Sequence, residues 1–448
     1  MKPNDNSENL KGREFQISNF KLQSSKMYQK SVLDNGLRIL TSAMPHTRSV
    51  SIGFFIGVGS RYESDEQSGV SHFIEHMLFK GTEKRPTAMD IAVAIEGIGG
   101  IFNAATGTES SVYWIKVAQP HLDIAIDVLV DMLRHSRFDP QEIDRERRVI
   151  IEEINLTHDT PDSLIHLLIN ELVWPDHPLG RDVAGSKESL SALDREGLLA
   201  YLKRHYQPSS TVVSVAGNVE HDAIVGKMAA FLDDWATGED ASYRPAKDNQ
   251  AEPRLRVHPK ETEQAHLCLS VPGIPRDHPD RFKLRLLNTV LGEGMSSRLF
   301  TEIREKRGLA YSIYSYLSAM HDTGAVGVYA GVDPGRIEDA IKAILAEWDR
   351  LRQESVPADE LNKAKEFVKG RLLLQMEDSF SVAAWYGRQE VLSPEVLTVD
   401  EVVEAIEAVT AADVQRVAQE LFLGEKLNLA VVGPFEDERG FKELLEQW

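Results

Sequence analysis

Short apolar runs and longer amphipathic stretches alternate along the first half of the chain. Runs of β-branched and aromatic residues bounded by turn residues predict strands, whereas apolar residues three or four apart predict helices. Asn35-Gly36 lies between two such runs and predicts a β-hairpin over residues 30–45. The other elements predicted here are strands at 49–60 and 210–219, two strands within 101–118, helices at 88–100 and 121–136, and helical sequence from Asp139-Pro140 to about residue 206.

The same order of elements returns after residues 236–253, a polar, turn-rich segment that we interpret as a linker. The elements predicted beyond it are strands at 265–274, 324–333 and 427–435 and helices at 280–294, 336–351 and 356–373. This repeat predicts an α+β fold with two homologous halves, each a mostly antiparallel sheet covered by helices. We expect domains at 28–235 and 254–448, preceded by a polar N-terminal extension at 1–27.

Residues 71–82, SHFIEHMLFKGT, contain the strongest candidate for chemistry. His72 and His76 are four residues apart, so on a helix both imidazoles lie on one face, with Glu75 projecting beside them. Ser71 or Ser68 is expected to cap the helix start, and Gly81 follows the last apolar residues. The pattern suits either a zinc site or two core histidines, and zinc requires a third protein ligand.

The H-x-x-E-H arrangement is the inverted zinc-protease signature. With it, the chain resembles the pitrilysin/insulysin family of metallopeptidases, and in particular its short, bacterial subunits similar to mitochondrial processing peptidase. The family's third ligand is a glutamate separated from the second histidine by 76 residues, which matches Glu153, with Glu152 as the neighbouring alternative. A family glutamate seven residues earlier matches Glu146 and is expected to orient a ligand. The resemblance thus implies one zinc ion per chain, bound by His72, His76 and Glu153.

The second half lacks these ligands and carries a different signature. Matching Glu142 to Glu360 gives an offset of 218 residues, which places Arg371 opposite Glu153. The segment SSRLFTEIREKRGLAYSIYS is similar to the family's second signature, an arginine followed seven residues later by a tyrosine. It matches Arg304, or its neighbour Arg307, and Tyr311. A guanidinium there would hold a peptide carbonyl, and a phenol would donate to the developing oxyanion.

Asn103, in the segment IFNAATG, matches a family asparagine that holds the peptide near the scissile bond. It lies on a strand whose edge, by the resemblance, pairs with extended substrates through main-chain hydrogen bonds. Without the resemblance, Asn103 would be a turn residue, Arg304 a solvated helix residue and Tyr311 a core aromatic at a strand start.

The resemblance implies a zinc-dependent endopeptidase that encloses extended peptides or unfolded segments between its halves, as in a clamshell. A zinc-bound water attacks the peptide carbonyl, and Glu75 serves as general base. Because both signatures lie on one chain of the family's subunit length, a homodimer is expected. One alternative is a non-catalytic or partner-dependent peptide-binding subunit of a heterodimeric processing peptidase. Another is a zinc hydrolase of small molecules, which the Arg304–Tyr311 signature disfavours.

Composition restricts partners and location. The 448 residues carry a net charge of −20 without a concentrated basic stripe, which argues against nucleic acid as a partner. The single cysteine, Cys268, excludes an intrachain disulfide, suits a reducing compartment and is expected to be a small buried core residue. No run approaches the roughly 18 apolar residues of a membrane span. Residues 1–27 lack an apolar signal core and contain acidic side chains, so we expect a cytoplasmic protein.

Overall fold

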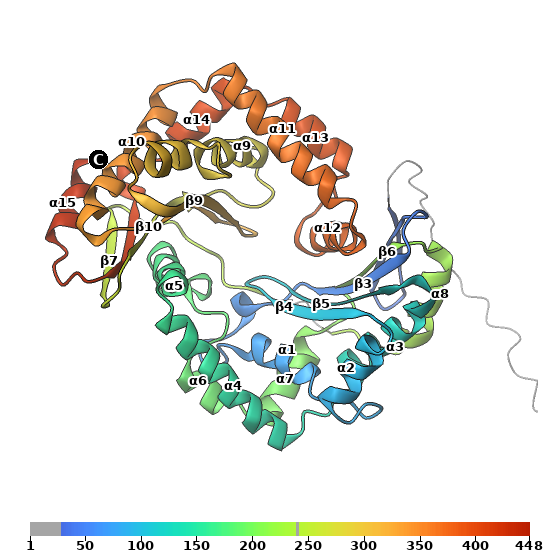
Figure 1. Cartoon of the computed structure of the whole chain (residues 1–448). Coiled ribbons are helices and arrows are strands. Elements are labelled where there is room, and N and C mark those ends of the chain that lie inside the picture. The colour runs from blue at the N-terminus through green and yellow to red at the C-terminus, as the bar shows by residue number, and fades with distance from the viewer. Residues whose placement is uncertain (1–27, 239–241) are drawn as a thin grey trace, which may run out of the picture.

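Two β-sheets form the frame of the protein, whose computed structural model describes residues 28–238 and 242–448 (Figure 1). The strand order is β1-β2-β6-β3-β5-β4 in the first sheet and β7-β11-β8-β10-β9 in the second. The first sheet contains β1 (Gln29–Val32), β2 (Arg38–Ala43), β3 (Ser49–Ile56), β4 (Ile101–Thr106), β5 (Ser111–Ala118) and β6 (Thr211–Gly217). The second contains β7 (Arg254–Pro259), β8 (Ala265–Gly273), β9 (Ala310–Ala319), β10 (Gly324–Val332) and β11 (Asn428–Gly433). The predicted N-terminal extension, residues 1–27, lies outside the described residues.

The two sheets have the same topology apart from β1, which extends the first sheet at one edge. In each, one pair is parallel, β2 with β6 and β7 with β11, and the other described pairs are antiparallel. The order β2-β6-β3-β5-β4 of the first sheet repeats as β7-β11-β8-β10-β9 in the second. The hairpin predicted at Asn35-Gly36 is the β1–β2 pair. The structure therefore confirms an α+β fold with two homologous halves of mostly antiparallel sheet.

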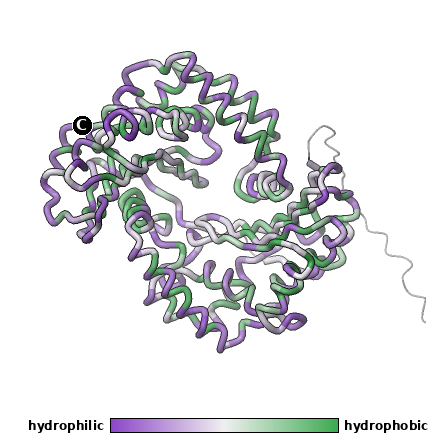
Figure 2. Tube along the Cα trace, in the orientation of Figure 1, coloured by the Kyte–Doolittle hydropathy of each residue, from purple (hydrophilic) through white to green (hydrophobic). Residues whose placement is uncertain are grey.

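Helices cover both sheets, and Figure 2 shows hydrophobic residues gathered along the strands and the helices that pack on them. The helices of the first half are α1 (Val70–Leu78), α2 (Ala88–Glu96), α3 (Leu122–His135), α4 (Pro140–Asp159), α5 (Pro161–Val173), α6 (Lys187–Ala192), α7 (Arg195–His205) and α8 (His221–Leu232). Those of the second are α9 (Arg281–Gly292), α10 (Ile337–Gln353), α11 (Ala358–Gln375), α12 (Ser379–Leu392), α13 (Val399–Glu407), α14 (Ala411–Leu421) and α15 (Arg439–Gln447). The helical sequence predicted up to residue 206 is thus four separate helices, because Pro161 starts a new helix and turns interrupt the rest. Within the described ranges, no helix combines the length and apolar character needed to cross a membrane.

One face of each sheet is covered by a helix from the other half. Helix α12 packs its apolar side chains against Phe55 and Val212 of the first sheet. Helix α5 packs in the same way against the second sheet, where it covers Cys268. Burial raises the pKa of the Cys268 thiol, which is fully enclosed and is the small core residue that the sequence predicts. The two halves are therefore interlocked through exchanged helices.

Candidate metal centre and active site

Helix α1 presents its polar side chains on one face and buries the other in the core of the first half. Its start is capped by Glu63, whose Oε2 accepts from the amide of Gly69 (2.7 Å) and whose Oε1 accepts from the amide of Ser71 (2.8 Å). The expected cap by Ser71 or Ser68 is therefore wrong. The hydroxyl of Ser71 is instead 3.1 Å from that of Tyr201. A buried carboxylate from outside the helix satisfies the amides that a serine was expected to satisfy.

Helix α4 runs beside α1 and supplies two carboxylates of the candidate site, Glu146 and Glu153. Pro140 occupies its first turn, and the side chain of Asp139 caps the helix by accepting from the amide of Gln141 (2.9 Å). Its buried side chains include Ile150 and Ile154, which fix the rotation of the helix against the core. Glu146 and Glu153 are thereby turned toward α1.

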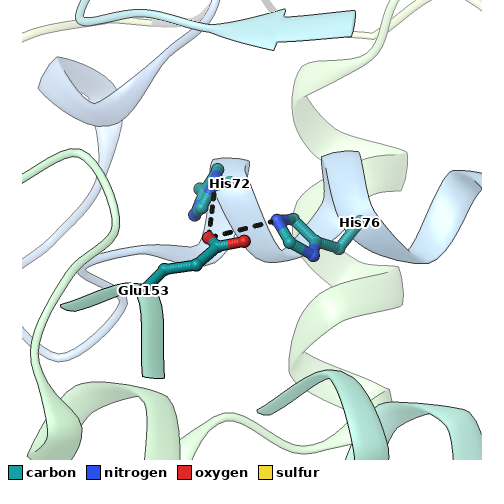
Figure 3. Close-up of side chains that lie close together, drawn as sticks. All are labelled: His72, His76 and Glu153. Atoms are coloured by element: carbon teal, nitrogen blue, oxygen red, sulfur yellow. Dashed lines mark ion pairs between the residues drawn. The ribbon is translucent and has the colours of Figure 1, made fainter. Parts of the chain in front are cut away.

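The three predicted ligands converge between these two helices (Figure 3). Oε2 of Glu153 is 3.8 Å from Nε2 of His72 and 3.6 Å from Nε2 of His76. Ligand atoms arranged tetrahedrally at the usual zinc distances lie about 3.4 Å apart. Two imidazoles and a carboxylate at these separations fit a zinc ion with a fourth position left for water. The structure brings Glu153 into this group rather than its exposed neighbour Glu152.

The neutral state of His72 and the hydrogen bonding of His76 also suit metal ligands. Burial, reinforced by the nearby charge of His76, lowers the pKa of His72 to about 4, so its imidazole is neutral at physiological pH. Nδ1 of His76 is 3.0 Å from Oε2 of Glu146, whose Oε1 accepts from Lys80 Nζ (2.8 Å). Burial works to raise the pKa of Glu146, but the hydrogen bonds from His76 and Lys80 outweigh it and hold that pKa below its usual value. An ionised Glu146 thus leaves Nε2 of His76 directed at the metal position.

Glu75 lies beside the ligands and is held from the first sheet. The hydroxyl of Thr106, the last residue of β4, donates to its Oε2. Burial raises the pKa of Glu75, and the Thr106 hydrogen bond only partly opposes this. A carboxylate with a raised pKa, adjacent to the metal position, is the group expected to accept a proton from a nearby water.

The strand β4, which ends at Thr106, lies at the free edge of the first sheet. Asn103 is exposed on this strand, and its Oδ1 accepts from the amide of Ala104 (2.8 Å). Phe102, on the opposite side of the strand, packs against Phe79 near the end of α1, with ring centroids 5.7 Å apart. Asn103 therefore points away from α1 but lies on the edge that runs past Glu75.

Arg304 and Tyr311 lie together at the free edge of the second sheet. Arg304 belongs to a π-helical segment, Phe300–Lys306, and its guanidinium is 5.2 Å from the Tyr311 ring centroid. Tyr311 is 73 % exposed, so it is not the core aromatic that the residue pattern alone suggests. Because Ala310 pairs with Val332 and Ser312 with Gly331, Tyr311 is the extra residue of a β-bulge.

A bulge redirects the side chain that it contains, and here that side chain is Tyr311. Arg304, rather than Arg307, is the arginine in contact with it. Within each half, the structure brings the signature residues together. No hydrogen bond or ion pair among the described residues joins the metal ligands of the first half to Arg304 and Tyr311 of the second.

The position of α1 is occupied in the second half by α9, and its surroundings differ. Arg285 and Thr289, both on α9, bind the carboxylate of Glu293 at 2.8 Å and 3.0 Å. Arg371, which the repeat places opposite Glu153, stacks on Phe367 at 5.0 Å. Across the described ranges, the only group of histidine, cysteine and acidic side chains placed to bind a metal is that of the first half.

Sequence reasoning missed three residues that shape the site. Lys80 follows His76 by four residues, so helical spacing could have indicated it. Glu63 and Thr106 carried no comparable signal, because each reaches its partner through the folded chain rather than through spacing. Both approach the metal-binding helix from outside it.

Comparison with known proteins identifies the family of the chain. Residues 38–187 match the family model "Insulinase (Peptidase family M16)", and residues 192–368 match "Peptidase M16 inactive domain". A protein of Streptomyces coelicolor named as an uncharacterized zinc protease is 38% identical, over 92% of this chain and 90% of its own length. A zinc protease of Bacillus subtilis is 37% identical, over 91% of this chain and 98% of its own.

Solved structures show the same fold. A protease from Helicobacter pylori superposes with a TM-score of 0.86 at 22% identity, covering 91% of this chain and 100% of its own. A structure from Pseudomonas fluorescens, described as a peptidase M16 inactive domain, gives a TM-score of 0.84 at 19% identity and covers 91% and 98%. Relatives of nearly equal length place the chain among short subunits. With its two matched domains and its zinc-protease relatives, the chain belongs to the insulinase family of peptidases, M16.

Proposed function

We propose that the protein is a zinc-dependent endopeptidase that hydrolyses extended peptides or unfolded segments between its two halves. The observation that carries the proposal is the convergence of His72, His76 and Glu153, with Glu75 beside them. The zinc proteases among its relatives support the same metal and the same reaction class.

The residues of the site have distinct roles in this proposal. Zinc bound by His72, His76 and Glu153 would activate a water and polarise the peptide carbonyl. Glu75 accepts the proton of the attacking water and returns it to the leaving amine, a task that its raised pKa suits. Glu146 keeps the imidazole ring of His76 in one orientation.

The edge strand β4 orients the substrate. Its free main-chain groups pair with an extended peptide, and Asn103 holds the chain near the bond to be cut. Arg304 binds a peptide carbonyl, and the hydroxyl of Tyr311 donates to the oxyanion as it develops. Tyr311 is exposed and Arg304 is partly exposed, so a bound peptide could reach both, and the second sheet faces the first across the molecule (Figure 1).

The proposal also assigns a role to each domain of the chain. Residues 28–235 form the catalytic domain, 236–253 the linker, and 254–448 a metal-free domain that completes the substrate chamber. Because one chain carries both signatures, two identical chains are enough for activity, and we expect a homodimer. A single buried cysteine and the absence of a disulfide among the described residues suit a cytoplasmic enzyme.

The proposal is tested with quenched-fluorescent peptides of several lengths and charges. Wild type is expected to cleave extended peptides, and a zinc chelator or Glu75→Gln is expected to abolish cleavage. Glu153→Gln should lose bound zinc, whereas the matched Glu152→Gln, one residue away and exposed, should keep both zinc and activity. Cleavage that survives the chelator and Glu75→Gln would refute the mechanism.

A second candidate is a peptide-binding subunit that depends on a partner. The match of residues 192–368 to a domain described as inactive favours it, because the described residues of that range supply none of the grouped metal ligands. One zinc ion per chain without cleavage of any peptide would support this candidate. Cleavage by the isolated wild-type chain would exclude it.

A further inference from the structure

The two halves and the linker meet at a buried ionic network. Arg61, which is fully buried, donates to Glu109 Oε1 (2.6 Å) and to Asp322 Oδ1 (2.5 Å). Glu109 Oε2 accepts from Arg276 Nη2 (2.7 Å). The ring of Tyr243 lies 4.1 Å from the Arg61 guanidinium. Arg61 and Glu109 belong to the first half, Tyr243 to the linker, and Arg276 and Asp322 to the second half.

Because it is buried, this ionic network is stable only within a narrow range of distances between its charged groups. A charge removed from water is stable only with a partner at hydrogen-bonding distance, so neither Arg61 nor Glu109 tolerates displacement of the other. Asp322 and Arg276 lie at the rim, where 27% and 22% of their side chains remain exposed. The second half therefore docks through its rim residues onto a fixed pair of the first half.

One connection leads from Arg61 to the metal-binding helix. Arg61 is two residues before Glu63, whose carboxylate caps α1 at Gly69 and Ser71. The segment is closely packed, because a side chain at Gly59 would come within 2.2 Å of the Gly107 carbonyl oxygen. A displacement of Arg61 is therefore transmitted to the cap rather than absorbed by a loose loop.

A second connection leads from Glu109 to the candidate general base. Glu109 lies in the turn between β4 and β5, three residues after Thr106, which donates to Glu75. The same turn binds the Arg61 segment, because the amide of Arg61 donates to the carbonyl of Thr108 (2.9 Å). From the second half, the amide of His321 donates to Glu109 Oε1 (2.9 Å).

We propose that Arg61 and Glu109 are positioning residues that couple docking of the second half to the placement of α1 and Glu75. The active site is fully ordered only when Arg276 and Asp322 are engaged. Separation of the halves releases both connections together. This inference rests on the proposed function and extends it, because it makes the catalytic rate depend on the contacts by which the second half docks onto the first.

The test removes the rim contacts and leaves the buried pair intact. Asp322→Asn and Arg276→Gln each remove one charge of the second half, and Arg276→Lys keeps a cation opposite Glu109. The matched control is Glu390→Gln, which removes the ion pairs of α12 with Lys30 (2.6 Å) and Arg38 (3.5 Å). These pairs also join the two halves, but their residues belong to β1, β2 and α12 rather than to α1 or the β4–β5 turn.

The kinetic readout is kcat and KM on one long peptide, with zinc content and melting temperature measured in parallel. Asp322→Asn and Arg276→Gln are expected to lower kcat roughly ten-fold, with KM and zinc content nearly unchanged. Arg276→Lys should recover most of the loss. Glu390→Gln should lower the melting temperature to a similar extent without lowering kcat. Equal effects of the rim variants and the control, or losses explained by lost zinc, would overturn the proposal.

Amide hydrogen exchange provides a readout that does not depend on activity. Asp322→Asn is expected to speed exchange in residues 59–78 and 106–110, whereas Glu390→Gln should not. Unchanged exchange in both segments would overturn the coupling. If wild type cleaves no peptide, the proposed peptidase function fails, and the exchange experiment still decides whether the halves are coupled to α1.

Discussion

At the scale of single residues, the site depends on which groups are ionised and which are neutral. His72 is neutral because it is buried, and Glu146 remains ionised because His76 and Lys80 donate to it. Glu75 shows the opposite balance, since burial raises its pKa more than Thr106 lowers it. Neighbouring carboxylates therefore acquire different roles from different surroundings.

Replacing Glu146 should weaken zinc binding without changing the ligands. Glu146→Gln keeps the shape of the side chain but loses the charge that fixes the His76 ring. Zinc affinity is expected to fall by about 10- to 100-fold, measured by competition with a chelating dye. Asp144→Asn, on the same helix with 75% of its side chain exposed, is the control and should bind zinc as wild type does. Equal affinity of Glu146→Gln and wild type would contradict this role.

Replacing Thr106 should slow catalysis and spare the metal. Thr106→Val keeps the β-branched shape and removes only the hydroxyl that donates to Glu75. We expect kcat to fall roughly ten-fold, because the carboxylate loses its fixed orientation. Zinc content, measured by atomic absorption, should stay at one ion per chain. An unchanged kcat would show that Glu75 is oriented by other contacts.

At the scale of elements, α1 depends on the shape of the chain that leads into it. Gly69 adopts a φ of +90°, and a Cβ there would lie 2.4 Å from the carbonyl oxygen of Ala184. Only glycine fits both conditions, and the turn directs two amides at Glu63. The metal-binding face of the helix is thus set by a glycine and a carboxylate outside it.

A methyl group at this position should destabilise the protein. Gly69→Ala is expected to lower the free energy of unfolding by about 1–3 kcal/mol, because the left-handed conformation and the contact both become strained. Gly226, inside α8, serves as the control, because a Cβ added there would meet no atom within 4 Å. Gly226→Ala should be neutral or slightly stabilising, since alanine favours helix. Urea denaturation measures both, and equal stability of the two variants would contradict the argument.

At the scale of the whole molecule, neither half buries its sheet alone. Val382 and Tyr386 of α12 cover the first sheet, and Leu164 and Leu168 of α5 cover the second. The halves repeat one topology, yet each completes the core of the other. Separating the two sheets would therefore either break these apolar contacts or require the segments that join α5 and α12 to their own halves to move.

Separating the halves should expose apolar surface. Residues 28–238 expressed alone leave Phe55 and Val212 without α12, so we expect aggregation and strong binding of a hydrophobic dye. Co-expression with residues 242–448 should suppress both aggregation and dye binding, because α12 and α5 can then pack on the sheets that they cover in the whole chain. A monodisperse first half that binds no dye would show that α12 is dispensable for folding.

Part of this protein is determined locally, and the sequence by itself was enough to predict it. Apolar periodicity located most strands and helices, and the repeated order predicted two homologous halves. The pair His72 and His76 was predictable because helical spacing alone places both on one face. Glu153 needed a family resemblance, since its distance from the histidines along the chain carries no geometric information.

Only the tertiary structure decided which contacts position the elements and the site residues. The cap from Glu63, the hydrogen bond from Thr106 and the bulge at Tyr311 all depend on contacts between segments that local spacing does not relate. The exchange of α5 and α12 has the same origin, because the apolar residues of a helix do not show which sheet they will cover, and the sequence pattern predicted no helix at α12. The local pattern therefore determined the elements and the metal motif, and packing between distant segments decided the shape of the site.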